Sequence, residues 1–264
     1  PGAARGTVQV VHGLGEHSGR YAAVAAALNA AGWHVAAHDL RGHGESSGKR
    51  GRLADSHAFM ADVALVHDHL LQQWPGGLHV LLGHSMGGLI AARFVAEGLA
   101  KAPAPWYRPF DALVMSSPAL DPGMNGFQQF LLAVLGPVAP NLGLGNGLKP
   151  EWISRDPAVV KAYVDDPLVH DRVSPRLVRF IVDAGQQVLS RAPQWQLPTL
   201  LLWAGADRCV APAGSAAFAA AAPAAVVQHQ VWPGLAHEIF NEPEKEKVLG
   251  DLIAWLEKRL DQAN

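Results

Sequence analysis

A serine between two glycines is the strongest chemical signal in this sequence. The segment Gly83-His84-Ser85-Met86-Gly87 has the spacing G-x-S-x-G, with the apolar run "HVLL" before it and a helical pattern after it. A tight turn from strand to helix crowds the backbone, and flanking glycines remove the side chains that would clash there. Such a turn exposes the hydroxyl at the carboxyl end of a sheet, where it can attack a carbonyl carbon. We therefore predict that Ser85 is a nucleophile rather than an ordinary helix N-cap.

A serine hydroxyl needs a base, and the base needs an acid that orients it. For a nucleophile on this kind of turn, the acid and then the histidine follow later in the chain. Asp207 in "LLLWAGADRCVAP" and His237 in "VWPGLAHEIFNEP" each follow an apolar run. The competitors are less suitable, because Asp183 falls in a helical segment and His229 within an apolar run. The sequence predicts that Asp207 and His237 serve Ser85; the alternatives are a turn-forming aspartate and a helix-capping histidine.

Attack on a carbonyl also requires hydrogen-bond donors for the oxyanion. The backbone N–H of Met86, directly after the nucleophile, is expected to be one of them. The loop in "VVHGLGEHSGRY", after the first apolar run, is expected to supply the other. We assign this second donor to the N–H of Leu14, the alternative being that Leu14 only fills the core.

Short apolar runs must position these groups, and they predict six strands at 7–11, 33–37, 79–82, 112–116, 199–203 and 226–232. Helical patterns alternate with them at about 20–31, 56–74, 86–100, 213–222 and 243–262. Most of the runs are apolar throughout, which is typical of a parallel sheet covered on both faces. The predicted fold class is therefore α/β, with a mostly parallel, doubly wound sheet.

The alternation breaks at 121–192, where no convincing strand signal appears. Helical patterns in "FQQFLLAVLGPVAP", at 156–164 and at 174–190 predict a helical cap (lid) at 121–192, inserted into a core of 1–120 and 193–264. Phe127, Phe130 and Val134 share helical spacing and give this part of the cap a wide apolar face. That face can pack down over the site or make transient contact with a membrane surface, and both roles stay open.

Composition argues against several other classes of protein. A net charge of −2 without a Lys/Arg cluster argues against nucleic acid as a partner. The single cysteine, Cys209, excludes an internal disulfide and a cysteine-rich zinc site. His67 and His69 are expected on different faces of a helix, at the surface, so we predict neither a metal site nor a cofactor. We see no leader peptide and no bilayer-spanning run, and expect a soluble, cytoplasmic protein, or one peripheral to a membrane.

Longer motifs follow one another along the chain: "HGLGEHSGRY", "DLRGHGESSG", "GHSMGG", "SSPAL", "ISRD", "DDPLVH", "GADRCV" and "GLAHEIFNE". From about Val10 to Leu256 they resemble those of the monoacylglycerol lipases and lysophospholipases of the α/β-hydrolase superfamily. The resemblance implies the α/β-hydrolase fold and a triad of Ser85, Asp207 and His237. It also implies a small lipid ester as substrate, cleaved through an acyl-enzyme, and a mobile cap over an apolar acyl tunnel.

The resemblance further implies which residues surround the substrate. Glu16 and Arg20 would lie near the polar glycerol end of the tunnel. Ile153, Leu168 and Val210 fall where family members line the pocket, although ordinary core positions explain these three equally well. The segment "DLRGHGESSG" is expected to be a structural turn without a chemical role.

One departure from the family concerns the sheet edge: family members usually carry an antiparallel hairpin before the strand at 7–11, and residues 1–6 are too few to form one. Other functions remain open on the same scaffold: a carboxylesterase, a lysophospholipase, a haloperoxidase-like enzyme that reuses the triad, or a non-catalytic binding module. A binding module would usually lack members of the triad. The sequence sets neither the acyl-chain preference nor the oligomeric state.

Overall fold

The computed structural model describes residues 4–263 and contains a six-stranded sheet with the order β2-β1-β3-β4-β7-β8. Neighbouring strands are parallel throughout this sheet. Its strands are β1 (Gly6–Val11), β2 (His34–His38), β3 (Leu78–His84), β4 (Ala112–Ser116), β7 (Thr199–Ala204) and β8 (Val227–Trp232). Each begins and ends within two residues of the range predicted from its apolar run. The predicted α/β fold with a mostly parallel sheet is confirmed.

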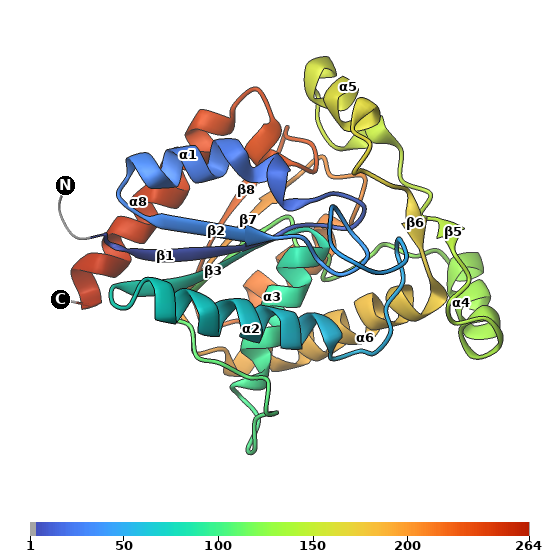
Figure 1. Cartoon of the computed structure of the whole chain (residues 1–264), viewed down its shortest axis with the longest axis horizontal. Coiled ribbons are helices and arrows are strands. Elements are labelled where there is room, and N and C mark those ends of the chain that lie inside the picture. The colour runs from blue at the N-terminus through green and yellow to red at the C-terminus, as the bar shows by residue number, and fades with distance from the viewer. Residues whose placement is uncertain (1–3, 264) are drawn as a thin grey trace.

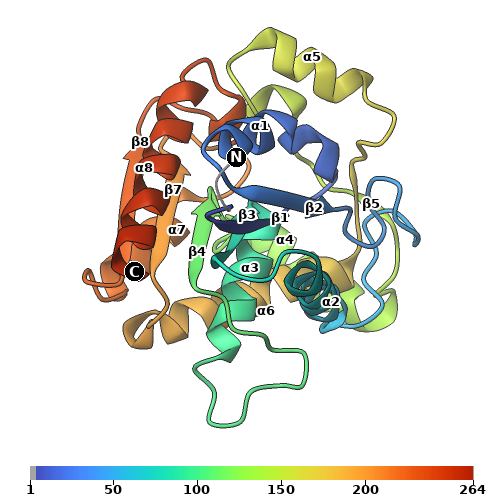
Figure 2. The same cartoon turned by 60° about the vertical axis from the view of Figure 1, so that its left-hand side comes forward.

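Helices cover both faces of the sheet (Figure 1). One face carries α1 (Ala22–Ala30) and α8 (Lys245–Ala263); the other carries α2 (Ala58–Gln73), α3 (Met86–Glu97), α6 (Pro175–Arg191) and α7 (Pro212–Ala221). Figure 2 shows β2 and β8 at the two opposite edges of the sheet. Of the helices in the described part of the chain, none is both long and apolar enough to cross a bilayer.

Alternate side chains of the central strands enter two separate cores. Val80 and Leu82 of β3 pack in the core beneath α1 and α8, whereas Leu81 packs in the core shared with α2, α3 and α6. A strand covered on both faces has to be apolar at every position, and this explains the uninterrupted runs in the sequence. The edge strand β8 differs, because most of its side chains are exposed.

The segment between β4 and β7 contains α4 (Gly126–Val138), α5 (Pro157–Asp165) and α6. It also contains two strands of two residues each, β5 (Leu144–Gly145) and β6 (Arg172–Val173), which pair antiparallel. The sequence predicts no strand here, because so short a pair carries no periodic pattern. Helix α6 buries Leu177, Phe180 and Val188 in the core beside α3, so it packs as part of the core. The division of the chain at 121 and 192 stays a prediction.

The expectation that both histidines of "HDHL" lie at the surface is wrong for His67. Its side chain is 2% exposed, and its Nε2 lies 3.1 Å from the carbonyl oxygen of Pro109. His67 shares the buried face of α2 with Val63 and Leu70, whereas His69 is exposed. The spacing correctly separates the two rings, but it does not tell which face of the helix is covered.

Candidate active site

Ser85 occupies the sharp turn between β3 and α3, with a φ of 56° and a ψ of −122°. A positive φ strains a residue that has a side chain, so the surrounding backbone must hold it. The N–H of Ser85 donates to the carbonyl of Ser116 at 2.9 Å, and the carbonyl of Ser85 accepts from the N–H of Leu89 at 3.0 Å and of Ala119 at 2.9 Å. Ser117 also has a positive φ, of 40°, but its hydroxyl accepts the N–H of Ala204 at 3.2 Å. Strain retained at a hydroxyl-bearing residue that lines a cavity, as Ser85 does, is typical of a functional position.

The two glycines of the motif are required by close backbone contacts. A Cβ at Gly83 would lie 2.3 Å from the carbonyl oxygen of Gly87, and a Cβ at Gly87 would lie 2.1 Å from that of Val11. Backbone atoms cannot move aside as a flexible side chain can. The strand-to-helix turn therefore imposes G-x-S-x-G, whereas a simple N-cap would not need both glycines.

Asp207 and His237 form a hydrogen-bonded pair at the ends of β7 and β8. Nδ1 of His237 lies 2.7 Å from Oδ2 of Asp207, and these two side chains are 6% and 1% exposed. Oδ1 of Asp207 accepts the N–H of Cys209 at 2.8 Å and of Val210 at 3.1 Å. Burial lowers the pKa of His237, but the carboxylate of Asp207, together with those of Glu238 and Glu16, outweighs burial and holds that pKa above its ordinary value. The pair thus favours a positively charged ring, as a general base requires once it has taken a proton.

One cavity of about 330 Å³ brings the predicted groups together, and its lining includes Ser85, His237 and Leu14. The parallel register explains this, because Gly83 pairs with the last residue of β1, and the ends of β7 and β8 are likewise in register. The ring of His84 packs on that of His237 with centroids 4.7 Å apart. Within residues 4–263 no hydrogen bond joins Ser85 to His237; in ligand-free enzymes such bonds often form only with substrate.

The two expected oxyanion donors lie on segments next to Ser85. Met86 is the first residue of α3, so its N–H has no partner within the helix and lies at the positive end of the helix dipole. Leu14 follows Gly13 in the loop after β1, and a Cβ on Gly13 would lie 3.1 Å from the Cβ of Ser85. The assignment of Leu14 and Met86 as donors stays a prediction.

The structure separates the five predicted substrate-binding residues. Glu16 and Ile153 line the cavity, whereas Arg20, Leu168 and Val210 are not part of its lining. Arg20 is held by two carboxylates beside the cavity. Val210 contributes its backbone N–H to Asp207 instead of its side chain to the pocket.

Several residues of the site were not predicted from the sequence. Glu238 and Tyr163 line the cavity, as do His84 and Cys209. Glu238 directly follows the predicted histidine, so its position in the sequence could have suggested a role in the site. Nothing in the sequence marks Tyr163 of α5. Burial raises the pKa of the Cys209 thiol, so it stays protonated and does not compete as a nucleophile. Burial lowers the pKa of His84 to about 3, so its ring adds no charge beside His237 at neutral pH.

Three potential metal ligands meet at this site. Among the described residues, Asp207, Cys209 and His237 offer donor atoms within 4.8 Å of one another. Two of these three are already joined as an acid–base pair, and the third carries a protonated thiol. We therefore interpret the group through acid–base chemistry rather than metal ligation.

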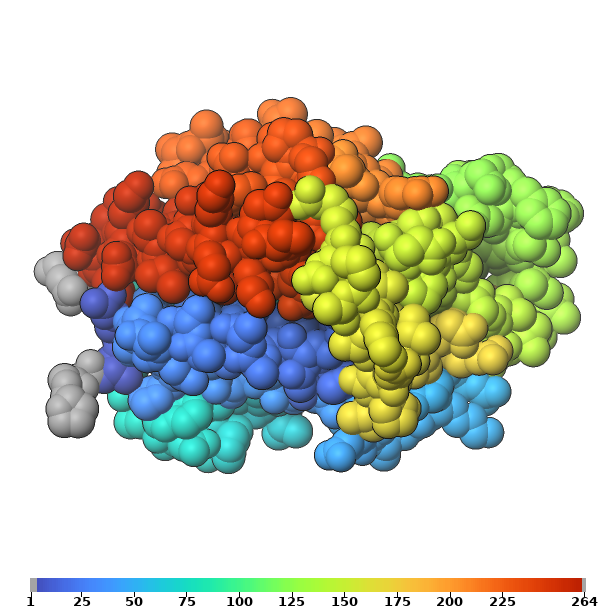
Figure 3. Space-filling view, turned by 90° about the horizontal axis from the view of Figure 1, so that it is seen from above, coloured from blue at the N-terminus to red at the C-terminus, as the bar shows by residue number. Residues whose placement is uncertain are grey.

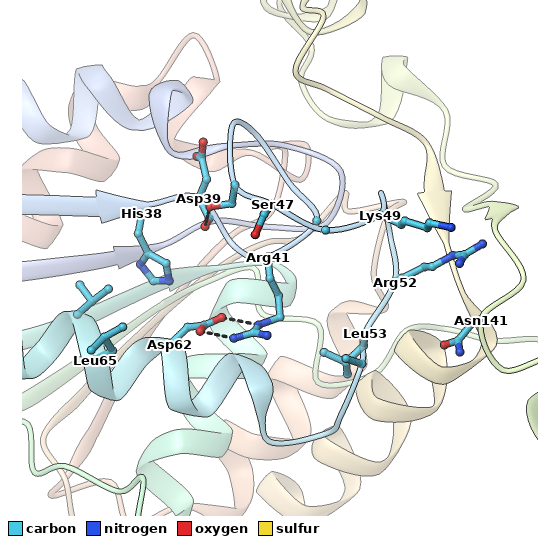
Figure 4. A pocket seen from close by; sticks show the side chains of 15 residues that line it. His38, Asp39, Arg41, Ser47, Lys49, Arg52, Leu53, Asp62, Leu65 and Asn141 are labelled. Carbon is cyan, nitrogen blue, oxygen red and sulfur yellow. Dashed lines mark hydrogen bonds and ion pairs between the residues drawn. The ribbon is translucent and has the colours of Figure 1, made fainter.

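A second hollow, of about 580 Å³, lies beside the turn that follows β2 (Figure 4). Arg41 and Asp62 form an ion pair within it, His38 points toward α2, and Lys49 and Arg52 extend toward the cap side. Its lining contains neither Ser85 nor His237. The expected structural turn is built around Asp39, which accepts the N–H groups of Ser18 and Glu45 at 2.8 Å each and also lines the hollow.

A mostly parallel sheet covered by helices on both faces, a strained serine after β3 and an Asp–His pair after later strands occur together in the α/β-hydrolases, and the fold and site define that class. Residues 2–244 match the family model described as "Serine aminopeptidase, S33". The chain belongs to this family, whose model covers most of its length.

Known proteins of this class resemble the chain over nearly its whole length. It is 38% identical to a monoacylglycerol lipase of Mycolicibacterium smegmatis, across 97% of this chain and 89% of that protein. It is 33% identical to the human monoglyceride lipase, across 98% and 84% of the two chains. The crystal structure of Paleococcus ferrophilus monoacylglycerol lipase superposes with a TM-score of 0.84 and 35% identity, covering 98% of this chain and 96% of that one.

Proposed function

We propose that this protein hydrolyses monoacylglycerols to glycerol and a free fatty acid through an acyl-enzyme on Ser85. The observation that carries the proposal is the meeting of the strained Ser85 with the Asp207-paired His237 in one cavity. The substrate class is supported by the names of the relatives above. Apolar cap residues and the carboxylates of Glu16 and Glu238 both line this cavity, as an amphiphilic ester with an acyl chain and a polar alcohol requires.

In the proposed reaction His237 accepts the proton of Ser85 while the serine oxygen attacks the ester carbonyl. The N–H groups of Met86 and Leu14 stabilise the negative oxygen that forms. His237 then gives its proton to the glycerol oxygen as the C–O bond breaks. Water then attacks the acyl-enzyme while His237 takes one of its protons. As the bond between the acyl carbon and the Ser85 oxygen breaks, His237 returns that proton to Ser85, and the fatty acid leaves. Asp207 holds the ring in the tautomer that leaves Nε2 free to accept.

A substrate panel tests this function. Wild type and Ser85→Ala are assayed on monoacylglycerols, diacylglycerols, lysophospholipids, short-chain esters and an aminoacyl anilide, the last for the peptidase activity that the family description names. We expect the highest kcat/KM on long-chain monoacylglycerols and loss of hydrolysis in Ser85→Ala. Activity confined to acetyl or butyryl esters would identify a short-chain carboxylesterase. Equal labelling of both proteins by a fluorophosphonate would refute Ser85 as the nucleophile.

We further propose that α4 docks on a lipid surface, as a peripheral contact of the cap. Phe127, Phe130 and Val138 are 68%, 63% and 80% exposed, and Leu132 is the buried residue of this helix. Most of its apolar surface therefore faces outward instead of covering the site. Such an exposed apolar patch on a cap is typical of an interaction surface.

Co-sedimentation with phosphatidylcholine vesicles tests this docking. Phe127→Ser and Phe130→Ser should each weaken vesicle binding, while hydrolysis of a water-soluble short-chain ester stays unchanged. Leu65→Ser is the matched control, because Leu65 is a similarly exposed apolar residue, 71% exposed, on α2 rather than on α4. Equal loss of binding in Leu65→Ser, or no loss in the α4 variants, contradicts the proposal.

A further inference from the structure

Arg20 joins two loops that border the cavity. Its Nη1 donates to Oε2 of Glu16 at 2.8 Å and to Oε1 of Glu238 at 2.5 Å, and its Nη2 donates to Oε2 of Glu238 at 2.7 Å. Arg20 is 11% exposed and each of the two carboxylates 6%. A buried, two-pronged guanidinium–carboxylate contact fixes orientation as well as charge. Glu16 and Glu238 are therefore held in one geometry although they are far apart in the sequence.

Glu16 is hydrogen-bonded to the loop after β1 that contains Gly13 and Leu14, which is the predicted oxyanion loop. Its Oε1 accepts the N–H of Gly13 at 2.6 Å and the hydroxyl of Tyr21 at 2.8 Å. Gly13 immediately precedes Leu14, whose N–H is the predicted second oxyanion donor. The conformation of the backbone at Gly13 and Leu14 thus depends on the Glu16 carboxylate, which Arg20 holds in place.

Glu238 lies in the loop that carries His237, the histidine loop, and is hydrogen-bonded to Ile153 of the segment between β4 and β7. It directly follows His237, and its Oε2 also accepts from Nδ2 of Asn241 at 2.9 Å. Its backbone N–H donates to the carbonyl of Ile153 at 2.8 Å. Movement of Glu238 would therefore disturb the ring of His237 and the cavity wall at Ile153 together.

The guanidinium of Arg20 also packs against the cap helix α5. Its Cζ lies 4.8 Å from the centre of the Tyr163 ring, a cation–π contact. A second link lies nearby, where Nε2 of His17 is 2.8 Å from Oδ2 of Asp166. Figure 3 shows the yellow segment that includes α5 lying against both the blue N-terminal and the red C-terminal parts.

We propose that Arg20 is a positioning residue that holds the oxyanion loop, the histidine loop and α5 in one reactive arrangement, and is not a ligand of the glycerol head group. It is not part of the cavity lining, and both of its terminal nitrogens are bound to carboxylates. The inference rests on the ester hydrolysis proposed above. It assigns to Arg20 an effect on the rate of acyl transfer that does not depend on the alcohol.

The test compares Arg20→Met and Arg20→Lys with wild type on two esters of the same fatty acid, the monoacylglycerol and the methyl ester. We expect Arg20→Met to lower kcat roughly 100-fold on both esters with little change in KM, because small displacements of catalytic groups cost about this much. Arg20→Lys keeps the charge but not the two-pronged contact and should recover part of kcat. Arg108→Met is the matched control, since it removes a two-pronged pair with Asp68 that is partly exposed and away from the cavity; it should stay within twofold of wild type.

Each outcome decides between clear alternatives. A loss confined to the glycerol ester would make Arg20 a head-group ligand and overturn the proposal, as would a kcat of Arg20→Met within twofold of wild type. Circular dichroism checks folding, and if Arg20→Met fails to fold, the split between the two esters is read from Arg20→Lys. If wild type hydrolyses neither ester, the proposed function fails instead, and the rate of fluorophosphonate labelling of Ser85 in each variant still tests the positioning role.

Discussion

Replacing Asp207 with asparagine should move the proton of the His237 ring from Nδ1 to Nε2 while leaving the shape of the site unchanged. Oδ1 of Asp207 accepts two backbone N–H groups, from Cys209 and Val210, and Oδ2 faces Nδ1 of His237. An asparagine must keep its carbonyl oxygen toward the two backbone donors, because its NH₂ group cannot accept from them. The NH₂ group then faces Nδ1, which has to act as an acceptor, so the single ring proton moves to Nε2.

The size of the effect follows from this change of tautomer. A ring that carries its proton on Nε2 cannot take the proton of Ser85, and the negative charge that stabilised the imidazolium is also lost. In a serine protease the same substitution lowers kcat about 10⁴-fold, and we expect a similar loss here. That factor corresponds to about 5.4 kcal/mol of transition-state stabilisation. Every hydrogen bond of the site is kept, so the melting temperature should change little.

The assay is steady-state hydrolysis of a monoacylglycerol by Asp207→Asn, with thermal unfolding measured on the same samples. Asp183→Asn is the matched control, because Asp183 is exposed on α6 and, like Asp207, lies between Ser85 and His237 in the chain. It should retain wild-type kcat. The reasoning is refuted if Asp207→Asn keeps more than a tenth of wild-type kcat, or if Asp183→Asn loses as much.

Two further predictions concern charge and packing at the same site. The ratio kcat/KM should fall on the acid side with an apparent pKa above the ordinary value of a histidine, because His237 must be neutral to accept a proton and its pKa is raised. Glu238→Gln removes a charge that raises the pKa of His237, so the acid limb of the profile should move to lower pH. An acid limb that does not move would contradict the electrostatic role of Glu238. Gly87→Ala places a Cβ 2.1 Å from the carbonyl oxygen of Val11 and should lower the free energy of unfolding by about 2–4 kcal/mol. Gly250→Ala, on α8 with open space at its Cβ, should raise it by roughly 0.5–1 kcal/mol, and urea titrations that gave both variants equal stability would rule out the steric explanation.

The fold could be predicted well because the sequence encodes it locally. An apolar run such as 79–82 reports a strand covered on both faces, and G-x-S-x-G reports a backbone turn that cannot hold a larger residue at Gly83 or Gly87. Chain order then selects Asp207 and His237 as candidates, since only groups after later parallel strands reach the same edge of the sheet. The two-residue strands β5 and β6 escaped this reasoning because two residues contain no period.

The surroundings of the candidate site could not be predicted in the same way. The family resemblance implies that Glu16 and Arg20 both lie near the substrate. In the structure Glu16 lines the cavity, whereas Arg20 is bound to two buried carboxylates. Leu168 and Val210 are not part of the lining, whereas Tyr163 of α5 lines the cavity although no local pattern marks it.

What the sequence by itself determined is the parallel α/β framework and the kind of chemistry that a serine on a strand-to-helix turn performs. Only the tertiary structure decided which side chains face the cavity, which carboxylates Arg20 holds and which face of α4 is left exposed. The physical reason is the separation along the sequence of the groups that interact. Strand formation and the serine turn depend on neighbours within a few residues. The direction of a side chain in the site depends on packing and charge contributed by segments more than 200 residues away, as between Arg20 and Glu238.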